Sequence, residues 1–270
     1  MKAIKYIASL LAGITLFSCD NFEDINTNPD SVTKVSPKLL ATGAIVGLML
    51  PSQKKDFVYN QMTCKYIGWS EALEGTQYNN FGRESFSGYT SLTNYKLMAE
   101  LTDKDETMNE DKRNAYKGLA LFLKAYRLFE YTLNVGDIPY EGILEGKEGN
   151  LTVAYNTQED VFKFLLNDLD KAHEYFQNAN QTTFNGDPIF GGKVEQWHRV
   201  SNALELRVLI NLSKKINSTD INIKSKFNEV LDRNLLLRSN ADNLQITFST
   251  KEGQLYPVSY THLTLPTILR

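Results

Sequence analysis

The chain has 270 residues, which is enough for one large domain or two small ones. Hydrophobic residues make up 42% and charged residues 23%, as in ordinary globular proteins. The formal net charge of −3 argues against a nucleic-acid partner, which would favour a basic face.

The first eighteen residues resemble a secretory signal. A short basic segment, residues 1–5, precedes an uncharged apolar run from Tyr6 to Phe17. This run is too short for a permanent membrane span, which needs about 20 apolar residues, and fits a signal peptide. The sequence Leu-Phe-Ser-Cys at 16–19 resembles a lipobox, so we expect Cys19 to be acylated and to become the N-terminus. The alternative is an ordinary signal peptide that contains a cysteine.

The two ends of the chain are expected to lie outside the folded domain. Residues 19–35 are predicted to form an acidic tether, whose early carboxylates resemble an export tag for the cell surface or only keep the tether solvated. Residues 258–270 show no clear helical period and resemble adapter read-through, so we interpret them as a non-native tail. The expected domain is therefore 36–257, in a protein that continues further.

Helical patterns fill most of this domain. Ser36 and Pro37 are typical of a helix start, and the helix should end before Pro51. A second helix is predicted over about 54–73. A loop rich in Gly, Asn and Tyr follows over 74–90, and a third helix is predicted over about 91–102.

The clearest helix is predicted over 111–134, where apolar residues recur at spacings of three and four and Gly136 suits a C-terminal cap. Thr157 should cap the next helix, with Asp160 at the capping-box position. Further helices are predicted from Val194 to about residue 215 and over about 221–234, with a turn at 187–192. In the helix predicted over 111–134, the apolar residues that should face the core are Ala115, Leu119, Phe122, Tyr126, Phe129 and Leu133.

These helices predict an all-α protein of antiparallel helix pairs. Pairs of about 34 residues are the unit of tetratricopeptide-like repeats. The sequence shows no metal site, since its three histidines, His173, His198 and His262, are far apart along the chain. Cys64 has no partner if Cys19 is lipidated, and a lone thiol is tolerated best when buried.

No enzyme or cofactor motif is present. Acidic residues cluster over 103–111, but they alternate with Lys and Arg before a helix, which is typical of a solvated face. The sequence lacks the nucleophile-elbow, phosphate-loop and dinucleotide fingerprints. We therefore expect neither catalysis nor a cofactor.

Four segments in order resemble the SusD/RagB family of outer-membrane lipoproteins. They are residues 126–130 (Tyr-Arg-Leu-Phe-Glu) with 136–140 (Gly-Asp-Ile-Pro-Tyr); 157–162 (Thr-Gln-Glu-Asp-Val-Phe) with 166–169 (Leu-Asn-Asp-Leu); 189–192 (Ile-Phe-Gly-Gly) with Trp197, Asn202, Leu204 and Arg207; and 20–29 at the start of the mature chain. Family members are usually close to twice as long, so the chain resembles an N-terminal half.

The resemblance implies a mostly helical protein with tetratricopeptide-like helix pairs. Such a protein is anchored in the outer membrane by its lipid, faces the cell exterior, and covers a SusC-like TonB-dependent transporter. It binds glycans, or in some members peptides, passes them to the channel and catalyses nothing.

The best ligand candidates are Trp69, Tyr78 and Asn80. A tryptophan or tyrosine face can stack on a sugar ring while an amide bonds its hydroxyls. Trp69 and Tyr78 could equally be core residues. Trp197 is predicted to be core because it lies on the apolar stripe of its helix.

Asp137 is predicted to form a turn, and Arg207 to be a structural arginine. Two functions remain open: a nutrient-binding partner of a transporter, or a helical-repeat scaffold that binds another surface protein and no sugar. An exposed aromatic surface in the 69–90 region would favour the first.

Overall fold

The computed structural model describes residues 35–49, 61, 64–68, 85–179, 182–217 and 220–251. The chain divides into two compact units, Met1–Val35 and Ser36–Arg270, and of the first unit only Val35 is described. The predicted signal peptide, Cys19 and the 258–270 tail all lie outside the described residues.

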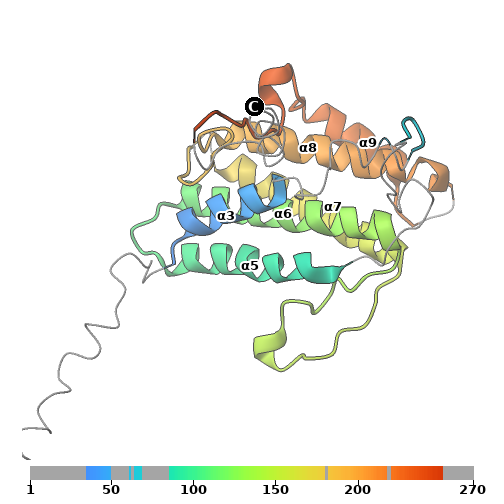
Figure 1. Ribbon diagram of the computed structural model, residues 1–270, viewed down its shortest axis with the longest axis horizontal. Coiled ribbons are helices and arrows are strands. Elements are labelled where there is room, and N and C mark those ends of the chain that lie inside the picture. The colour runs from blue at the N-terminus through green and yellow to red at the C-terminus, as the bar shows by residue number, and fades with distance from the viewer. Residues whose placement is uncertain are drawn as a thin grey trace, which may run out of the picture. The chain divides into compact units, whose positions relative to one another are not determined.

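The second unit is built from helices (Figure 1). Its described residues form α3 (Pro37–Met49), α5 (Tyr89–Lys104), α6 (Glu110–Val135), α7 (Gln158–Asn178), α8 (Val194–Asn211) and α9 (Ile223–Asp232). Successive helices from α5 to α8 pack on one another, α3 packs on α5 and α6, and α9 packs on α8. The described segments contain two isolated β-bridges and no strand. The predicted all-α fold of helix pairs is confirmed.

The long helices begin at capping residues. Asn109 accepts a hydrogen bond from the Lys112 amide at 3.0 Å at the start of α6. The Thr157 hydroxyl accepts one from the Asp160 amide at 3.2 Å and donates to the Asp160 carboxylate at 2.7 Å. These bonds satisfy amides that have no partner within the helix, which explains why the predicted starts of α6 and α7 are confirmed.

The core runs between α3, α5, α6, α7 and α8. Trp197 is fully buried, as predicted, and its ring meets Phe122 edge-on with centroids 5.6 Å apart. Its indole Nε1 donates to Asp187 at 2.8 Å. Asp187 also accepts the amides of Ile189 and Gly192, so the predicted turn at 187–192 wraps around one carboxylate.

Four predictions need correction. Residues 64–68 form a turn and not part of a helix over 54–73, most of which lies outside the described residues. The helix from Val194 ends at Asn211, and a 3-10 turn follows at Ser213–Lys215. Leu133 is 42% exposed although it continues the α6 apolar spacing and was predicted to face the core. Cys64 is exposed and not buried.

Candidate functional site

The predicted ligand residues Trp69, Tyr78 and Asn80 lie outside the described residues. The described chain resumes at Ser85, whose side chain accepts a hydrogen bond from the Ser87 amide and begins the 3-10 turn Phe86–Gly88. This turn falls within the loop predicted over 74–90, so the surface around it is the described end of that loop.

An aromatic cluster, formed by the packed rings of Phe86, Tyr89 and Tyr131 with the Tyr155 phenol near Tyr89, occupies this surface. Phe86 stacks on Tyr131 with centroids 5.5 Å apart, and Tyr89 lies 5.3 Å from Tyr131. Burial, followed by the nearby phenols of Tyr131 and Tyr155, raises the pKa of Tyr89. Phe86 is 36% exposed and Tyr155 64% exposed, so both residues are accessible to solvent.

Hydrogen bonds hold the inner members of the aromatic cluster in place. The Gly88 amide donates to the Tyr131 hydroxyl at 2.9 Å. The Tyr89 hydroxyl donates to the Pro139 carbonyl at 2.9 Å, which ties α5 to the loop after α6. Sequence analysis missed this cluster because Tyr131 lies more than forty residues from Phe86 along the chain. The sequence pointed only to the loop over 74–90, which contains Phe86.

Three adjoining cavities lie on the face formed by α5, α6 and residues 140–148. Their volumes are about 370, 400 and 290 Å³, and Lys96 and Leu144 line all three. A fourth cavity of about 480 Å³ lies between α7 and α9. Volumes of this order suit small ligands.

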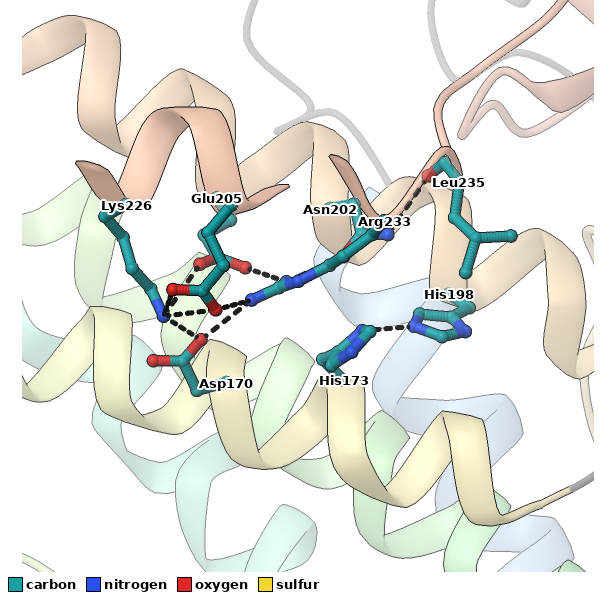
Figure 2. A network of polar contacts seen from close by, with 9 residues as sticks. Asp170, His173, His198, Asn202, Glu205, Lys226, Arg233 and Leu235 are labelled. Carbon is teal, nitrogen blue, oxygen red and sulfur yellow. Dashed lines mark hydrogen bonds and ion pairs between the residues drawn. The ribbon is translucent and has the colours of Figure 1, made fainter. Parts of the chain in front are cut away.

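A polar network fastens α9 to α7 and α8 (Figure 2). Arg233 donates to Glu205 at 2.7 Å, to Asn202 at 3.0 Å and to Asp170 at 3.0 Å. Lys226 also pairs with Asp170. Glu205 is 1% exposed, and burial raises its pKa to about 7 although the charge of Arg233 opposes this shift. The network is a structural clamp, because its charges neutralise one another.

The structure brings two histidines together that the sequence separates. His173 Nδ1 lies 2.6 Å from His198 Nε2, at the packed surface between α7 and α8 (Figure 2). Burial, followed by the charge of His173, lowers the pKa of His198 to about 4. Within the described part of the chain no group of three or more metal-binding side chains exists, so the expectation of no zinc site is unchanged there.

The other residues singled out in the sequence have structural roles. Asp137 accepts a hydrogen bond from the Gln158 amide at 2.8 Å and so helps to start α7. The guanidinium of Arg207 lies over the Phe129 ring at 5.6 Å, joining the ends of α6 and α8. Among the described residues, no helix is both long and apolar enough to cross a membrane.

This architecture defines a helical-repeat protein with an exposed aromatic cluster and open cavities. A family model described as starch-binding associating with outer membrane, of SusD-like type, matches residues 29–263. The chain belongs to this SusD-like family, which confirms the resemblance drawn from the sequence.

Solved structures agree. A SusD homologue from Bacteroides fragilis NCTC 9343 has 40% identity and a TM-score of 0.72, with 80% of this chain and 44% of that chain covered. A second homologue from the same strain has 30% identity and a TM-score of 0.71, with 83% and 46% covered. An outer membrane protein from Bacteroides vulgatus ATCC 8482, whose description names nutrient binding, has 28% identity and a TM-score of 0.68.

The chain spans less than half the length of the two Bacteroides fragilis homologues. A search of curated proteins found no match.

Proposed function

We propose that this protein binds nutrient glycans at the outer membrane and delivers them to a SusC-like TonB-dependent transporter, without catalysing a reaction. The observation that carries this proposal is the family match over residues 29–263, with its description of starch binding at the outer membrane. The transporter would receive the glycan from a protein held beside it by a lipid on Cys19.

The aromatic cluster supports a glycan surface. Sugar rings stack on flat aromatic faces, and Tyr adds a hydroxyl that can bond the sugar. Phe86 and Tyr155 are accessible to solvent for such contacts, and Phe86 stacks on Tyr131. Trp69, Tyr78 and Asn80 remain ligand residues predicted from the sequence alone, because they lie outside the described residues.

The test is calorimetric binding of a starch-derived oligosaccharide to the purified chain. Phe86→Ala and Tyr155→Ala should each weaken binding by roughly five- to thirtyfold, the usual effect of removing a central aromatic contact. Leu151→Ala is the matched control, because Leu151 is an exposed apolar residue (83%) outside the cluster. Unchanged affinity in both aromatic variants, with unchanged melting, would contradict the glycan surface.

A helical scaffold that binds another surface protein is the second candidate. The exposed side chains of Leu133, Val135 and Ile210 favour it, because they lie at the ends of α6 and α8, which Arg207 and Phe129 join. Retention of a surface protein by the chain, with no binding of any starch oligosaccharide, would support the scaffold over the glycan-binding function.

A further inference from the structure

The loop between α6 and α7 contains a segment with the sequence pattern of a β-strand. Residues 151–155, the edge segment, read Leu-Thr-Val-Ala-Tyr, so large apolar residues alternate with the smaller Thr and Ala. Thr, Val and Tyr are residues that favour strands. The edge segment forms no helix or turn, and the loop that contains it projects from the helices (Figure 1).

The edge segment is held in place at both ends. At its start, the Asn150 amide donates to the Glu145 carbonyl at 3.1 Å, and Asn150 Nδ2 donates to the Glu145 carboxylate at 3.3 Å. At its end, the Asn156 amide donates to the Ile138 carbonyl at 3.0 Å, and the Asn156 side-chain oxygen accepts the Tyr140 amide at 2.8 Å. The edge segment is therefore fixed before any partner binds, which lowers the entropic cost of pairing.

Between these two ends the backbone has no partner strand. Among the residues that the structure describes, none forms a hydrogen bond with the backbone of residues 151–155. Leu151 and Tyr155 are 83% and 64% exposed, and Val153 is half-buried. An exposed strand edge whose N–H and C=O groups are unpaired can add a strand from another chain.

We propose that the edge segment pairs with the same segment of a second copy of this chain, as two antiparallel strands related by a twofold axis. A register centred on Val153 places Leu151 opposite Tyr155 of the second copy, and Val153 opposite its own equivalent. Aliphatic–aromatic and β-branched pairs stabilise antiparallel strands. No residue from 149 to 157 is charged, so this register brings no like charges together.

The contact is small, because each copy contributes only residues 151–155. It buries less surface than the roughly 1,200 Å² of a stable interface, so we expect a dissociation constant on the order of 100 μM. A lipid on Cys19 would hold copies of the protein close together on one membrane, where weak pairing is favoured. The inference goes beyond the proposed function and does not depend on a glycan ligand.

The first experiment is sedimentation equilibrium of the purified chain over concentrations that span the expected dissociation constant. Val153→Asp and Val153→Lys should each weaken dimerisation by about tenfold, because like charges then face each other across the twofold axis. An equimolar mixture of the two variants should restore the dimer, since Asp then faces Lys. The matched control is Leu39→Asp, which adds the same charge at an exposed apolar residue of α3 and should leave dimerisation unchanged.

A second pair of variants tests the backbone. The N–H groups of successive strand residues point to opposite edges, so either Thr152 or Val153 directs its N–H to the second copy. Proline lacks this donor, and at least one of Thr152→Pro and Val153→Pro should therefore abolish dimerisation. Both should keep the melting temperature of the wild type, because neither amide has a hydrogen bond within the described part of the chain.

Three results would overturn the proposal. They are a wild type that stays monomeric over the whole range, a mixture of the charge variants that dimerises no better than each alone, and equal effects of Val153→Asp and Leu39→Asp. Binding of a SusC-like transporter that Val153→Asp abolishes, without self-association, would assign the edge segment to that partner instead. Phe86→Ala should leave dimerisation unchanged, so failure of the glycan surface and failure of strand pairing are distinguishable.

Discussion

Asp187 shows how much of this fold depends on single polar residues. Its carboxylate accepts hydrogen bonds from the amides of Ile189, Phe190 and Gly192 and from the Trp197 indole, the last at 2.8 Å. A carboxylate is suited to this task because its two oxygens offer about four acceptor positions.

Asp187→Ala should destabilise the protein by at least about 3 kcal/mol, because it leaves several donors without their acceptor in a half-buried turn. Asp187→Asn should cost less, since one oxygen remains as an acceptor. Urea unfolding of both variants measures the difference. Equal loss in Ala and Asn would contradict the hydrogen-bond explanation and indicate that the negative charge itself is needed.

The buried His198 should make stability depend on pH. Burial, the charge of His173 and the nearby guanidinium groups of Arg233 and Arg199 lower its pKa from 6.5 to about 4. The unfolded state therefore binds a proton more readily, and the stabilising contribution is complete above pH 6.5 and is lost as the pH falls toward 4. The loss is at most roughly 3.5 kcal/mol, at about 1.4 kcal/mol per pKa unit.

Comparison of the wild type with His198→Gln separates the pH dependence caused by His198 from that caused by Glu205. Burial raises the pKa of Glu205 to about 7, so the stability that Glu205 contributes is present at low pH and is lost as the pH rises through 7. Glu205 is the same in both proteins, and the difference between their unfolding free energies should therefore change between pH 6.5 and 4. A difference that stays constant over this range would count against a neutral, buried His198.

At the scale of elements, α9 is held mainly by charge. Only Ile223 and Val230 of this helix are buried, whereas Lys226 and the adjacent Arg233 bind Asp170 and Glu205. Glu205 is almost fully buried, so removal of Arg233 leaves its carboxyl group without its main hydrogen-bond donor and with only the Lys226 ammonium, 3.8 Å away, as counter-charge (Figure 2).

Arg233→Met should destabilise the protein by about 3–5 kcal/mol. The double variant Glu205→Gln/Arg233→Met should be more stable than the sum of its single changes, because neither buried charge remains. Lys163→Met is the control, since its ion pairs are exposed and should contribute little to stability. Urea unfolding of the wild type, Glu205→Gln, Arg233→Met and the double variant gives the coupling energy. Strictly additive changes in unfolding free energy would refute the clamp.

The same elements show what could be predicted from the sequence. The C-terminal end of α6 and the start of α7 were predicted within two residues, because Gly136 and Thr157 mark them locally. The helix from Val194 was extended too far, because Leu212 continues its apolar spacing while the backbone changes to a 3-10 turn at Ser213. The spacing of apolar residues cannot reveal this switch from α-helix to 3-10 turn, because the switch depends on the backbone conformation after Leu212.

The candidate site was less predictable than the fold. The Gly-Asn-Tyr composition pointed to residues 69–90, but Tyr131, on which Phe86 stacks, comes from the end of α6. The pairing of His173 with His198 and the sharing of Lys124 between two cavities also depend on how α6, α7 and α8 pack. Side chains that meet only through tertiary packing leave no periodic signal in one sequence.

For the whole molecule, capture of a nutrient beside a transporter requires that the protein stay at the membrane. We predict that Cys19 carries acyl chains, each stabilised by about 0.8 kcal/mol per buried CH₂ group. Intact mass spectrometry of membrane-extracted protein should show the diacylglyceryl thioether, and Cys19→Ala should move the protein to the soluble fraction.

Cys64→Ala is the matched control for the anchor, because Cys64 is the second of the two cysteines of the chain and its thiol is free and exposed. This variant should remain in the membrane fraction with unchanged melting, since no disulfide is lost. Because two or three acyl chains hold a protein far more firmly than one, high salt should not release the wild type. A soluble wild type with a free Cys19 thiol would exclude the lipid anchor. The proposed delivery to a membrane transporter would then lack the attachment that holds the protein at the membrane.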